Sequence, residues 1–316
     1  MAGVMQGFVM VAAIMAVGYV LGRRGTLGPG GPQALNAFVF HAALPALLLD
    51  KITTSHPGEL FNAQSAQVVV SALAAGAVSL ALARLLLRRP WAESVVMMLA
   101  GSYCNAAYLG LPLAAYVLGD ATVVIPVVLF QVGFYGPVAV AALEIAATRR
   151  AAAPQPASSR RGRVLAVVAA PARNPVVLAA AAGLVIAFSP LTVPEMVARP
   201  VHVLGEATIP VALAVFGMSL AASRPFGAQT QWADLVLAVV VKNFVHPLIA
   251  GLCAYFVWGF SGAPLQAAIV LGALPTAQNV FIYALRYRIH HVVVRDCALL
   301  STVVSLPVLL LIAALI

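Results

Sequence analysis

Residues 93–118 read ESVVMMLAGSYCNAAYLGLPLAAYVL, which is apolar for long enough to cross a membrane as a helix. Asn105 nevertheless lies in the middle of this stretch, and Pro112 follows seven residues later. A second apolar stretch, residues 263–286, reads APLQAAIVLGALPTAQNVFIYALR and carries the polar segment PTAQN at 275–279. Proline removes a backbone donor and clashes with the preceding turn of a helix. Both stretches therefore predict membrane helices that are interrupted part-way.

The composition of the chain excludes a soluble protein. Of the 316 residues, 63% are hydrophobic and only 9% are charged, and the mean hydropathy is +1.01. A soluble domain carries roughly 25% charged residues and about 45–50% apolar ones. This excludes a soluble enzyme, a nucleic-acid-binding domain and a disordered chain. The three cysteines lie in apolar runs without metal-ligand spacing, so we expect no disulfide framework, no metal and no cofactor.

A helix needs about 20 mainly apolar residues to span a ~30 Å hydrocarbon core, and ten runs of this kind occur in the chain. The sequence therefore predicts an all-α integral membrane protein with ten transmembrane helices. The predicted spans are residues 3–22, 32–50, 63–87, 93–118, 121–147, 174–191, 198–222, 232–257, 263–286 and 293–316.

Basic residues fall almost entirely on one side of these spans. Fifteen of the 18 lie on the side reached after the first span, only Lys51 and Arg199 lie on the other side, and Lys242 lies inside the eighth span. Basic loops are retained in the cytoplasm. We therefore expect cytoplasmic basic loops and extracytoplasmic termini, in the inner or plasma membrane. The net charge of +9 then indicates topology and not a nucleic-acid partner.

The one sizeable loop, residues 148–173, is rich in Pro, Ala, Ser and Arg, as a flexible basic linker is. Five predicted spans precede it and five follow it. Residues 1–147 and 174–316 are therefore expected to form two repeats. Because each half has an odd number of spans, the second repeat must be inverted with respect to the first.

Interruptions occur at matching places in the two halves. Pro45 and Pro210 lie inside the second and seventh spans, and Pro112 and Pro275 lie inside the fourth and ninth. Backbone groups freed by a break in lipid must be satisfied by protein or by water in a cavity. Paired interrupted spans therefore point to a transporter binding site. The alternative is that the prolines only kink packed helices.

Four motifs resemble the auxin efflux carrier family, which includes plant auxin exporters and bacterial malate and malonate permeases. They are LNAFVFHAALPALL at 35–48, NAAYLGLP at 105–112, KNFVHP at 242–247 and LPTAQNVF at 274–281. The lack of a large central domain resembles the prokaryotic branch. The resemblance implies a fold shared with bile acid:sodium symporters and some sodium/proton antiporters, in which two broken helices cross near the membrane midplane. It also implies an organic anion, mostly a small carboxylate, as the substrate.

Carried onto this chain, the resemblance places the crossover at Asn105 and Pro112 in the fourth span and at Pro275, Gln278 and Asn279 in the ninth. Amide side chains can donate hydrogen bonds to a carboxylate and can also satisfy the backbone of a broken helix. We therefore expect these three amides to bind the substrate, the backbone, or both. Two further candidate substrate contacts are Thr276 and Tyr103.

Glu206 is the only acid, and Lys242 the only base, well inside a predicted span. A charge near the bilayer centre costs about 2.5–3.5 kcal/mol on insertion scales, so it normally pairs, faces a cavity or titrates. Glu206 is expected to couple protons or to pair with Lys242. Lys242 is expected to hold a substrate carboxylate, to replace a coupling ion, or to be neutralised by Glu206. His41, the counterpart of Glu206 in the first half, has either a coupling role or a packing role.

Gly18 and Gly22 lie four residues apart in the first span, a spacing typical of close helix packing in membranes.

The sequence thus predicts a secondary transporter, not an enzyme, that moves a small organic anion by alternating access, coupled to protons or to the membrane potential. A sodium-coupled symporter is the alternative, because amides and unwound carbonyls suit Na⁺. A channel is disfavoured by the inverted halves. An intramembrane enzyme is disfavoured because the spans carry no catalytic constellation and no nucleotide-binding motif. The expected partners are the anion, the lipid bilayer and a proton or sodium ion. A homodimer, the substrate and the direction of transport are left open.

Overall fold

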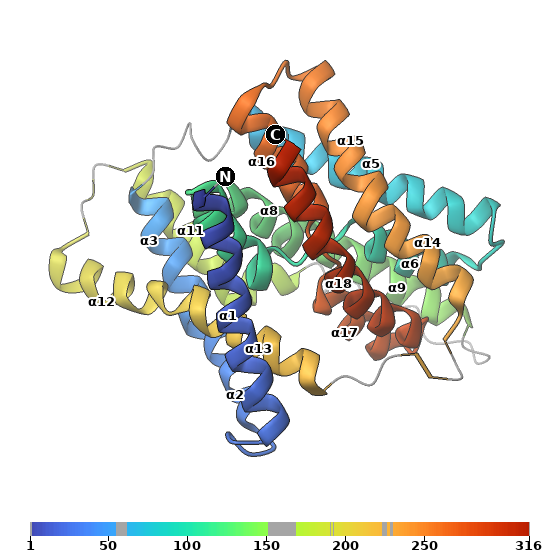
Figure 1. The fold of residues 1–316 in the computed structure, drawn as a ribbon, viewed down its shortest axis with the longest axis horizontal. Helices are drawn as coiled ribbons and strands as arrows, with labels where there is room; N and C mark the ends of the chain where they lie inside the picture. Colours follow the sequence, from blue (N-terminus) through green and yellow to red (C-terminus); the bar gives the residue numbers. More distant parts are fainter. Residues whose placement is uncertain are drawn as a thin grey trace. The chain divides into compact units, whose positions relative to one another are not determined.

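The computed structural model describes residues 2–54, 62–150, 169–189, 191, 193–222, 226–227 and 230–315. Within these residues the chain is helical, and its one β-type pairing is an isolated antiparallel bridge between Cys104 and Thr276. The α-helices are α1 (Ala2–Arg24), α2 (Gly31–Phe38), α3 (Leu44–Thr54), α5 (Ala63–Leu85), α6 (Trp91–Ser102), α7 (Leu111–Leu113), α8 (Ile125–Phe130), α9 (Gly136–Arg150), α11 (Pro175–Ala187), α12 (Glu195–Glu206), α13 (Thr208–Ala222), α14 (Trp232–Val240), α15 (His246–Leu252), α16 (Gly262–Ala273), α17 (Gln278–Tyr287) and α18 (His291–Leu315) (Figure 1).

Short π-helical and 3₁₀ segments join several of these helices into longer ones. The π-helical segments are η1 (Val39–Ala43), η2 (Ala106–Gly110), η3 (Ala114–Leu118), η5 (Gln131–Tyr135), η7 (Val241–Val245) and η8 (Cys253–Val257), and the 3₁₀ segments are η4 (Ala121–Val124) and η6 (Ala170–Arg173). A π-helical turn carries one extra residue and widens the helix locally. Because of these joints, a single membrane span can contain two or three labelled helices.

Six helical stretches are long and apolar enough, by length and composition, to cross a membrane. They are Gly31–Thr54, Ala63–Leu85, Ala121–Ala146, Glu195–Ala221, Trp232–Val257 and His291–Ile312. Three shorter apolar helices are Ala106–Leu118, Pro175–Ala187 and Gly262–Ala273. The predicted all-α membrane class is confirmed, whereas the count of ten spans stays a prediction.

The helices form two compact units, and each unit draws on both halves of the sequence. Unit 1 comprises Met1–Ala66, Ala106–Leu129 and Ala172–Ser223. Unit 2 comprises Gln67–Asn105, Phe130–Pro171 and Arg224–Ile316. The units therefore do not follow the expected sequence division at the linker, most of which (151–168) lies outside the described residues.

In unit 1, α1 and α13 lie side by side (Figure 1). A methyl group added to Gly18 would overlap the carbonyl oxygen of Ala214, and one added to Gly217 would overlap that of Met15. Without a hydrophobic force between helices in lipid, close backbone contact of this kind is a main source of association. The close packing expected at Gly18 is confirmed.

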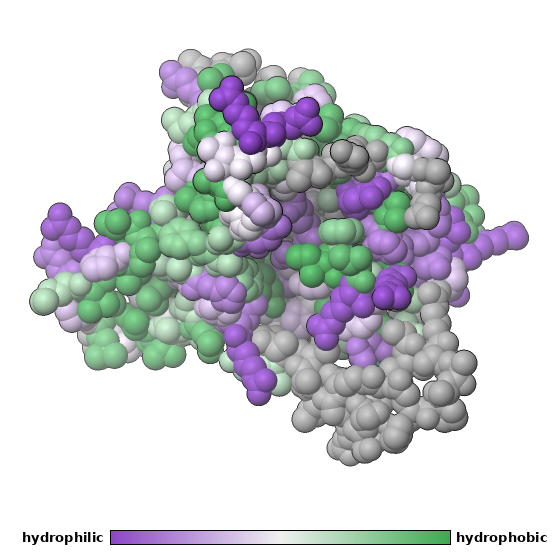
Figure 2. All heavy atoms as spheres, turned by 90° about the horizontal axis from the view of Figure 1, so that it is seen from below, coloured by the Kyte–Doolittle hydropathy of each residue, from purple (hydrophilic) through white to green (hydrophobic). Residues whose placement is uncertain are grey.

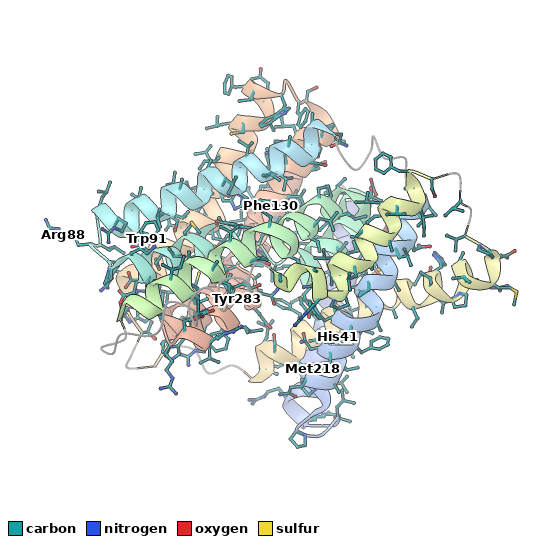
Figure 3. The ribbon with its side chains drawn as sticks, turned by 180° about the vertical axis from the view of Figure 1, so that it is seen from behind. His41, Arg88, Trp91, Phe130, Met218 and Tyr283 are labelled. Atoms are coloured by element: carbon teal, nitrogen blue, oxygen red, sulfur yellow. The ribbon has the colours of Figure 1, made fainter. Side chains whose placement is uncertain are left out.

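In unit 2, α6 is buried on both of its sides. One side packs with α9 and α17 through side chains such as Leu99, Leu143 and Val280. The other packs with α14 and α18 through side chains that include Met97 and Leu235. Figure 3 labels Tyr283 and Phe130 among these helices, whereas Arg88 projects away from them. This enclosure fixes the C-terminal end of α6, where the candidate site begins.

The surface is rich in apolar side chains, as a bilayer requires. Large hydrophobic residues such as Phe256, Leu248 and Val185 are exposed. Figure 2 shows green, hydrophobic residues over much of the visible face, with purple, hydrophilic residues protruding from it. A soluble monomer rarely exposes so much contiguous apolar surface.

Candidate functional site

Two broken helices meet in unit 2. Helix α6 ends at Ser102, and the chain is non-helical through Tyr103, Cys104 and Asn105 before it becomes helical again at Ala106. Helix α16 ends at Ala273, and the next helix, α17, begins only at Gln278. The sequence predicted interruptions in both of these apolar stretches.

The two unwound segments pair with each other as a short antiparallel ladder. The Asn105 N–H donates to the Pro275 carbonyl at 2.8 Å, and the Ala277 N–H donates to the Tyr103 carbonyl at 3.0 Å. Cys104 and Thr276 lie opposite each other between these bonds. Each break therefore satisfies backbone groups that the other frees, which is what a broken helix at membrane depth requires.

Buried side chains form hydrogen bonds with other polar backbone groups of the crossing. The Thr276 hydroxyl donates to the Ala100 carbonyl at 2.6 Å, and the Thr276 N–H donates to Ser301 Oγ at 3.1 Å. With its amide oriented to match donors with acceptors, Gln131 donates to the Cys104 carbonyl at 2.8 Å and accepts from the Cys104 N–H at 3.1 Å. The crossing is thus held from α6, η5 and α18 at once.

Two buried polar groups of the crossing, the Asn105 amide nitrogen and the Tyr103 hydroxyl, have no hydrogen-bond partner among the described residues. The Asn105 side chain is only 2% exposed, and its Nδ2 has no hydrogen-bond partner among the described residues. Buried polar atoms are nearly always bonded, so an orphan donor calls for an explanation such as a ligand or water. Nearby, the Tyr103 ring packs edge-on against the Tyr283 ring of α17, with ring centroids 6.3 Å apart. The structure therefore brings Asn105, Tyr103, Thr276 and Asn279 to one crossing.

The N-terminus of α17 lies at the same place. Its N-cap, Ala277, offers no side-chain acceptor to the first turn. Gln278 and Asn279 are the first two residues of the helix and are partly exposed. A helix N-terminus presents free N–H groups and a partial positive charge, which favour an anion.

Lys242 lies fully buried in η7 of the same unit. Its Nζ donates to the Gly272 carbonyl at 2.7 Å and lies 2.9 Å from His246 Nδ1. Gly272 belongs to the last turn of α16, directly before the break. Both contacts are to neutral groups when His246 is neutral, so within the described residues the structure shows no carboxylate paired with this lysine.

Glu206 and His41 belong to unit 1 and have their own surroundings. The Glu206 side chain is 66% exposed, and its Oε1 lies 3.3 Å from His202 Nε2. His41 lies in η1, is exposed, and packs edge-on against Phe40 with ring centroids 5.1 Å apart. The partner that the structure gives Glu206 is therefore a histidine, and the partners that it gives Lys242 are His246 and Gly272.

The four prolines fall in different settings. Pro275 lies in the α16–α17 break. Helix continues through Pro45, Pro112 and Pro210, where we expected breaks. Pro45 and Pro112 each follow a π-helical segment, η1 or η2, whose wider turn relieves the clash with the preceding carbonyl. Pro210 lies in the first turn of α13, where its missing N–H costs least. In the fourth span the break therefore lies at 103–105 and not at the proline.

The comparisons with known proteins agree with this architecture. A model of a family described as membrane transport protein, the auxin efflux carrier family, matches residues 4–313. The chain belongs to this family. It is 29% identical over 277 residues to a Rhizobium meliloti (strain 1021) protein named "Putative malonate transporter", across 86% of this chain and 82% of that protein. It is also 28% identical over 142 residues to the Oryza sativa subsp. japonica protein named "Probable auxin efflux carrier component 3b", across 44% of this chain and 24% of that one.

As a member of the auxin efflux carrier family, the chain is a multi-pass membrane transporter that acts on a small substrate, and it is not an enzyme. The sequence reasoning missed two residues that build its crossing, Gln131 and Ser301. Both are polar residues inside predicted apolar spans, and that signal was available in the sequence.

Proposed function

We propose that this transporter moves a small carboxylate across the cell membrane by alternating access, and that the crossing in unit 2 binds the anion. The observation that carries the proposal is the orphan donor of Asn105, which lies within the ladder formed by the two broken helices. A carboxylate oxygen supplies the acceptor that this Nδ2 lacks.

The other groups at the crossing suit the same ligand. The N-terminus of α17 carries the positive end of the helix dipole, and Gln278 and Asn279 in its first turn have amides of the kind that can donate to a carboxylate. The Tyr103 hydroxyl, which has no hydrogen-bond partner among the described residues, is a further donor at the crossing. Donors fixed on buried backbone pair with an anion without being reorganised first, which favours binding.

The names of the relatives support a carboxylate of modest size. The Rhizobium protein covers most of this chain and carries malonate in its name, whereas the rice protein matches less than half of the chain. We therefore propose a malonate-like dicarboxylate ahead of an aromatic acid such as auxin.

For coupling, we propose that Lys242 acts as an internal cation. Its ammonium lies against a carbonyl in the last turn of α16, where the negative end of the helix dipole favours a cation. A bound Na⁺ would occupy this kind of position next to an unwound segment. Because the Lys242 ammonium takes the place of a sodium ion in this proposal, transport is expected to be coupled to protons or driven by the membrane potential. Sodium coupling is the second candidate.

The finer topology belongs to the same proposal. We propose ten spans in two inverted repeats of five, with both termini extracytoplasmic and the basic loops cytoplasmic. The division into units follows this repeat for the first three predicted spans of each half, because unit 1 takes the first two and unit 2 takes most of the third. The fourth and fifth spans do not follow it, because those of the first half are divided between the units and those of the second half lie in unit 2. A homodimer is compatible with this arrangement.

The test is uptake of radiolabelled malonate into liposomes that contain the purified protein, with a pH gradient or a voltage imposed in turn and with sodium replaced by choline. Uptake that follows pH or voltage and does not change with sodium replacement is the expected result. Protein that moves no small carboxylate under any of these conditions contradicts the proposed function. Uptake that requires sodium contradicts the internal-cation role of Lys242 and supports the second candidate.

A further inference from the structure

Unit 1 contains a cavity of about 390 Å³ that is built from residues other than those of the crossing. Helices α3 and α12, the start of α13 and the segment from η3 to η4 line it. Its titratable lining residues are Asp50, Lys51, Tyr116, Asp120, His202 and Glu206. Three carboxylates against one lysine make this lining acidic, which is unsuited to an organic anion.

His202 lies between two of these carboxylates. Its Nδ1 is 3.0 Å from Asp50 Oδ2 on α3, and its Nε2 is 3.3 Å from Glu206 Oε1 one turn further along α12. Asp50 is the more enclosed of the two acids, with its side chain 14% exposed. Through Nδ1 the imidazole therefore links α12 to α3, and through Nε2 it contacts an acid of its own helix.

The chemistry of imidazole makes this arrangement depend on a proton. A neutral histidine has one N–H donor and one nitrogen lone pair, whereas a protonated histidine has two donors. With a neutral ring, one carboxylate would face a lone pair and be repelled. Only the imidazolium offers an N–H to both acids, of which Asp50 is at hydrogen-bond distance and Glu206 at ion-pair distance, so this pair of carboxylates favours a ring with an extra proton.

The surrounding groups modulate this site without replacing its proton. Lys51 Nζ lies 3.9 Å from Asp50 Oδ2 and competes weakly for that carboxylate. The Asp120 carboxylate accepts hydrogen bonds from the N–H and the hydroxyl of Thr122, at 2.8 and 2.7 Å. Of the other elements packed on α3 and α12, α11 and α13 have no titratable side chain, and η1 contributes His41.

We propose that His202 is a proton-binding site of this cavity and that the bound proton fastens α12 to α3. The proton comes from water in the cavity and adds to the bare ring nitrogen. Its release removes the ionic link between α12 and α3. Glu206, the second acid beside the ring, is the last residue of α12.

The direct test is ring NMR of ¹⁵N-histidine-labelled protein, which does not depend on transport. The signal that His202→Asn removes identifies the residue. We expect both ring nitrogens to be protonated at neutral pH, and we expect the titration midpoint of the ring to be lower in Glu206→Gln and in Asp50→Asn than in the wild type. A ring that is neutral at this pH, or a midpoint that neither substitution moves, overturns the proposal.

A second test asks whether the site acts in transport, and this arm alone rests on the proposed function. Asparagine and glutamine place an amide donor near the positions of Nδ1 and Nε2, but they do not titrate. We expect the pH dependence of uptake to flatten in His202→Asn and in His202→Gln and to persist in the control His291→Asn. An unchanged pH dependence in both His202 variants overturns the link to transport. If no variant transports, the NMR result still decides the proton site.

Discussion

The backbone N–H of Asn105 donates to the carbonyl of Pro275 at 2.8 Å, which joins the fourth predicted span to the ninth at the point where each is broken. This bond and its partner between Ala277 and Tyr103 make the two breaks a single structural element. Damage to either break should therefore affect both.

Thr276 tests that dependence. Its hydroxyl donates to the Ala100 carbonyl, so Thr276→Val leaves a buried carbonyl unsatisfied, at a cost of about 1–3 kcal/mol. We expect a lower midpoint of thermal unfolding and slower uptake. Thr276→Ser keeps the hydroxyl and should stay close to the wild type. If the valine variant is as stable and active as the serine variant, this bond does not hold the crossing.

Gly18 tests the packing of unit 1. Gly18→Leu places a side chain where the carbonyl oxygen of Ala214 lies, so α1 and α13 must separate. Inserting bulk into a packed interface costs typically about 1–3 kcal/mol, and more where the obstacle is backbone. We expect aggregation in size-exclusion chromatography or a clearly lower unfolding temperature. Gly30→Ala is the control, because a methyl group there meets open space; equal stability of the two variants would contradict the packing.

Arg89 tests an ion pair that anchors α14. Its guanidinium binds both carboxylate oxygens of Asp234, at 2.9 and 2.6 Å, and Asp234 is fully buried. This hydrogen bonding raises the pKa of Arg89 further above its ordinary value, so the pair should persist across the neutral pH range. Arg89→Gln leaves a buried carboxylate with a weaker partner, and we expect a loss of thermal stability.

Arg88 is the matched control for this pair. Its side chain is exposed and projects away from the helices (Figure 3). Arg88→Gln should therefore unfold at the wild-type temperature. A control that is destabilised as much as Arg89→Gln would show that general loss of positive charge, and not the Asp234 contact, is responsible.

Substitution of Lys242 tests whether this residue contributes to substrate binding and not to stability. Lys242→Met removes the cost of burying a charge, but it also leaves the buried Gly272 carbonyl without its donor. Because these two effects oppose each other, we expect Lys242→Met to unfold close to the wild-type temperature and yet to lose the stabilisation that malonate gives the wild type. A variant that malonate still stabilises fully would remove Lys242 from the transport cycle.

Much of the candidate site could be predicted from the sequence, because its signals are local. Polar residues in an apolar run marked the break at Asn105, and the PTAQN segment that begins at Pro275 marked its counterpart. Pro45 and Pro112 were misleading because π-helical turns, which depend on tertiary packing, let the helix continue through them. The pairing of Gln131 with Cys104 and the grouping of helices into units also depend on contacts between distant segments, which no local pattern encodes.

The affinity for malonate of Asn105→Asp, compared with that of Asn62→Asp, tests the central claim most directly. The first substitution replaces the orphan donor with a carboxylate, whereas the second changes an exposed side chain at which aspartate can also accept the cap bond from Ser65. The account predicts that Asn105→Asp raises the Kd by about tenfold or more, which corresponds to about 1.4 kcal/mol. Asn279→Ala should weaken binding in the same direction, and Asn62→Asp should bind as the wild type does. Wild-type affinity in folded Asn105→Asp and in Asn279→Ala would contradict the claim that the crossing binds the anion.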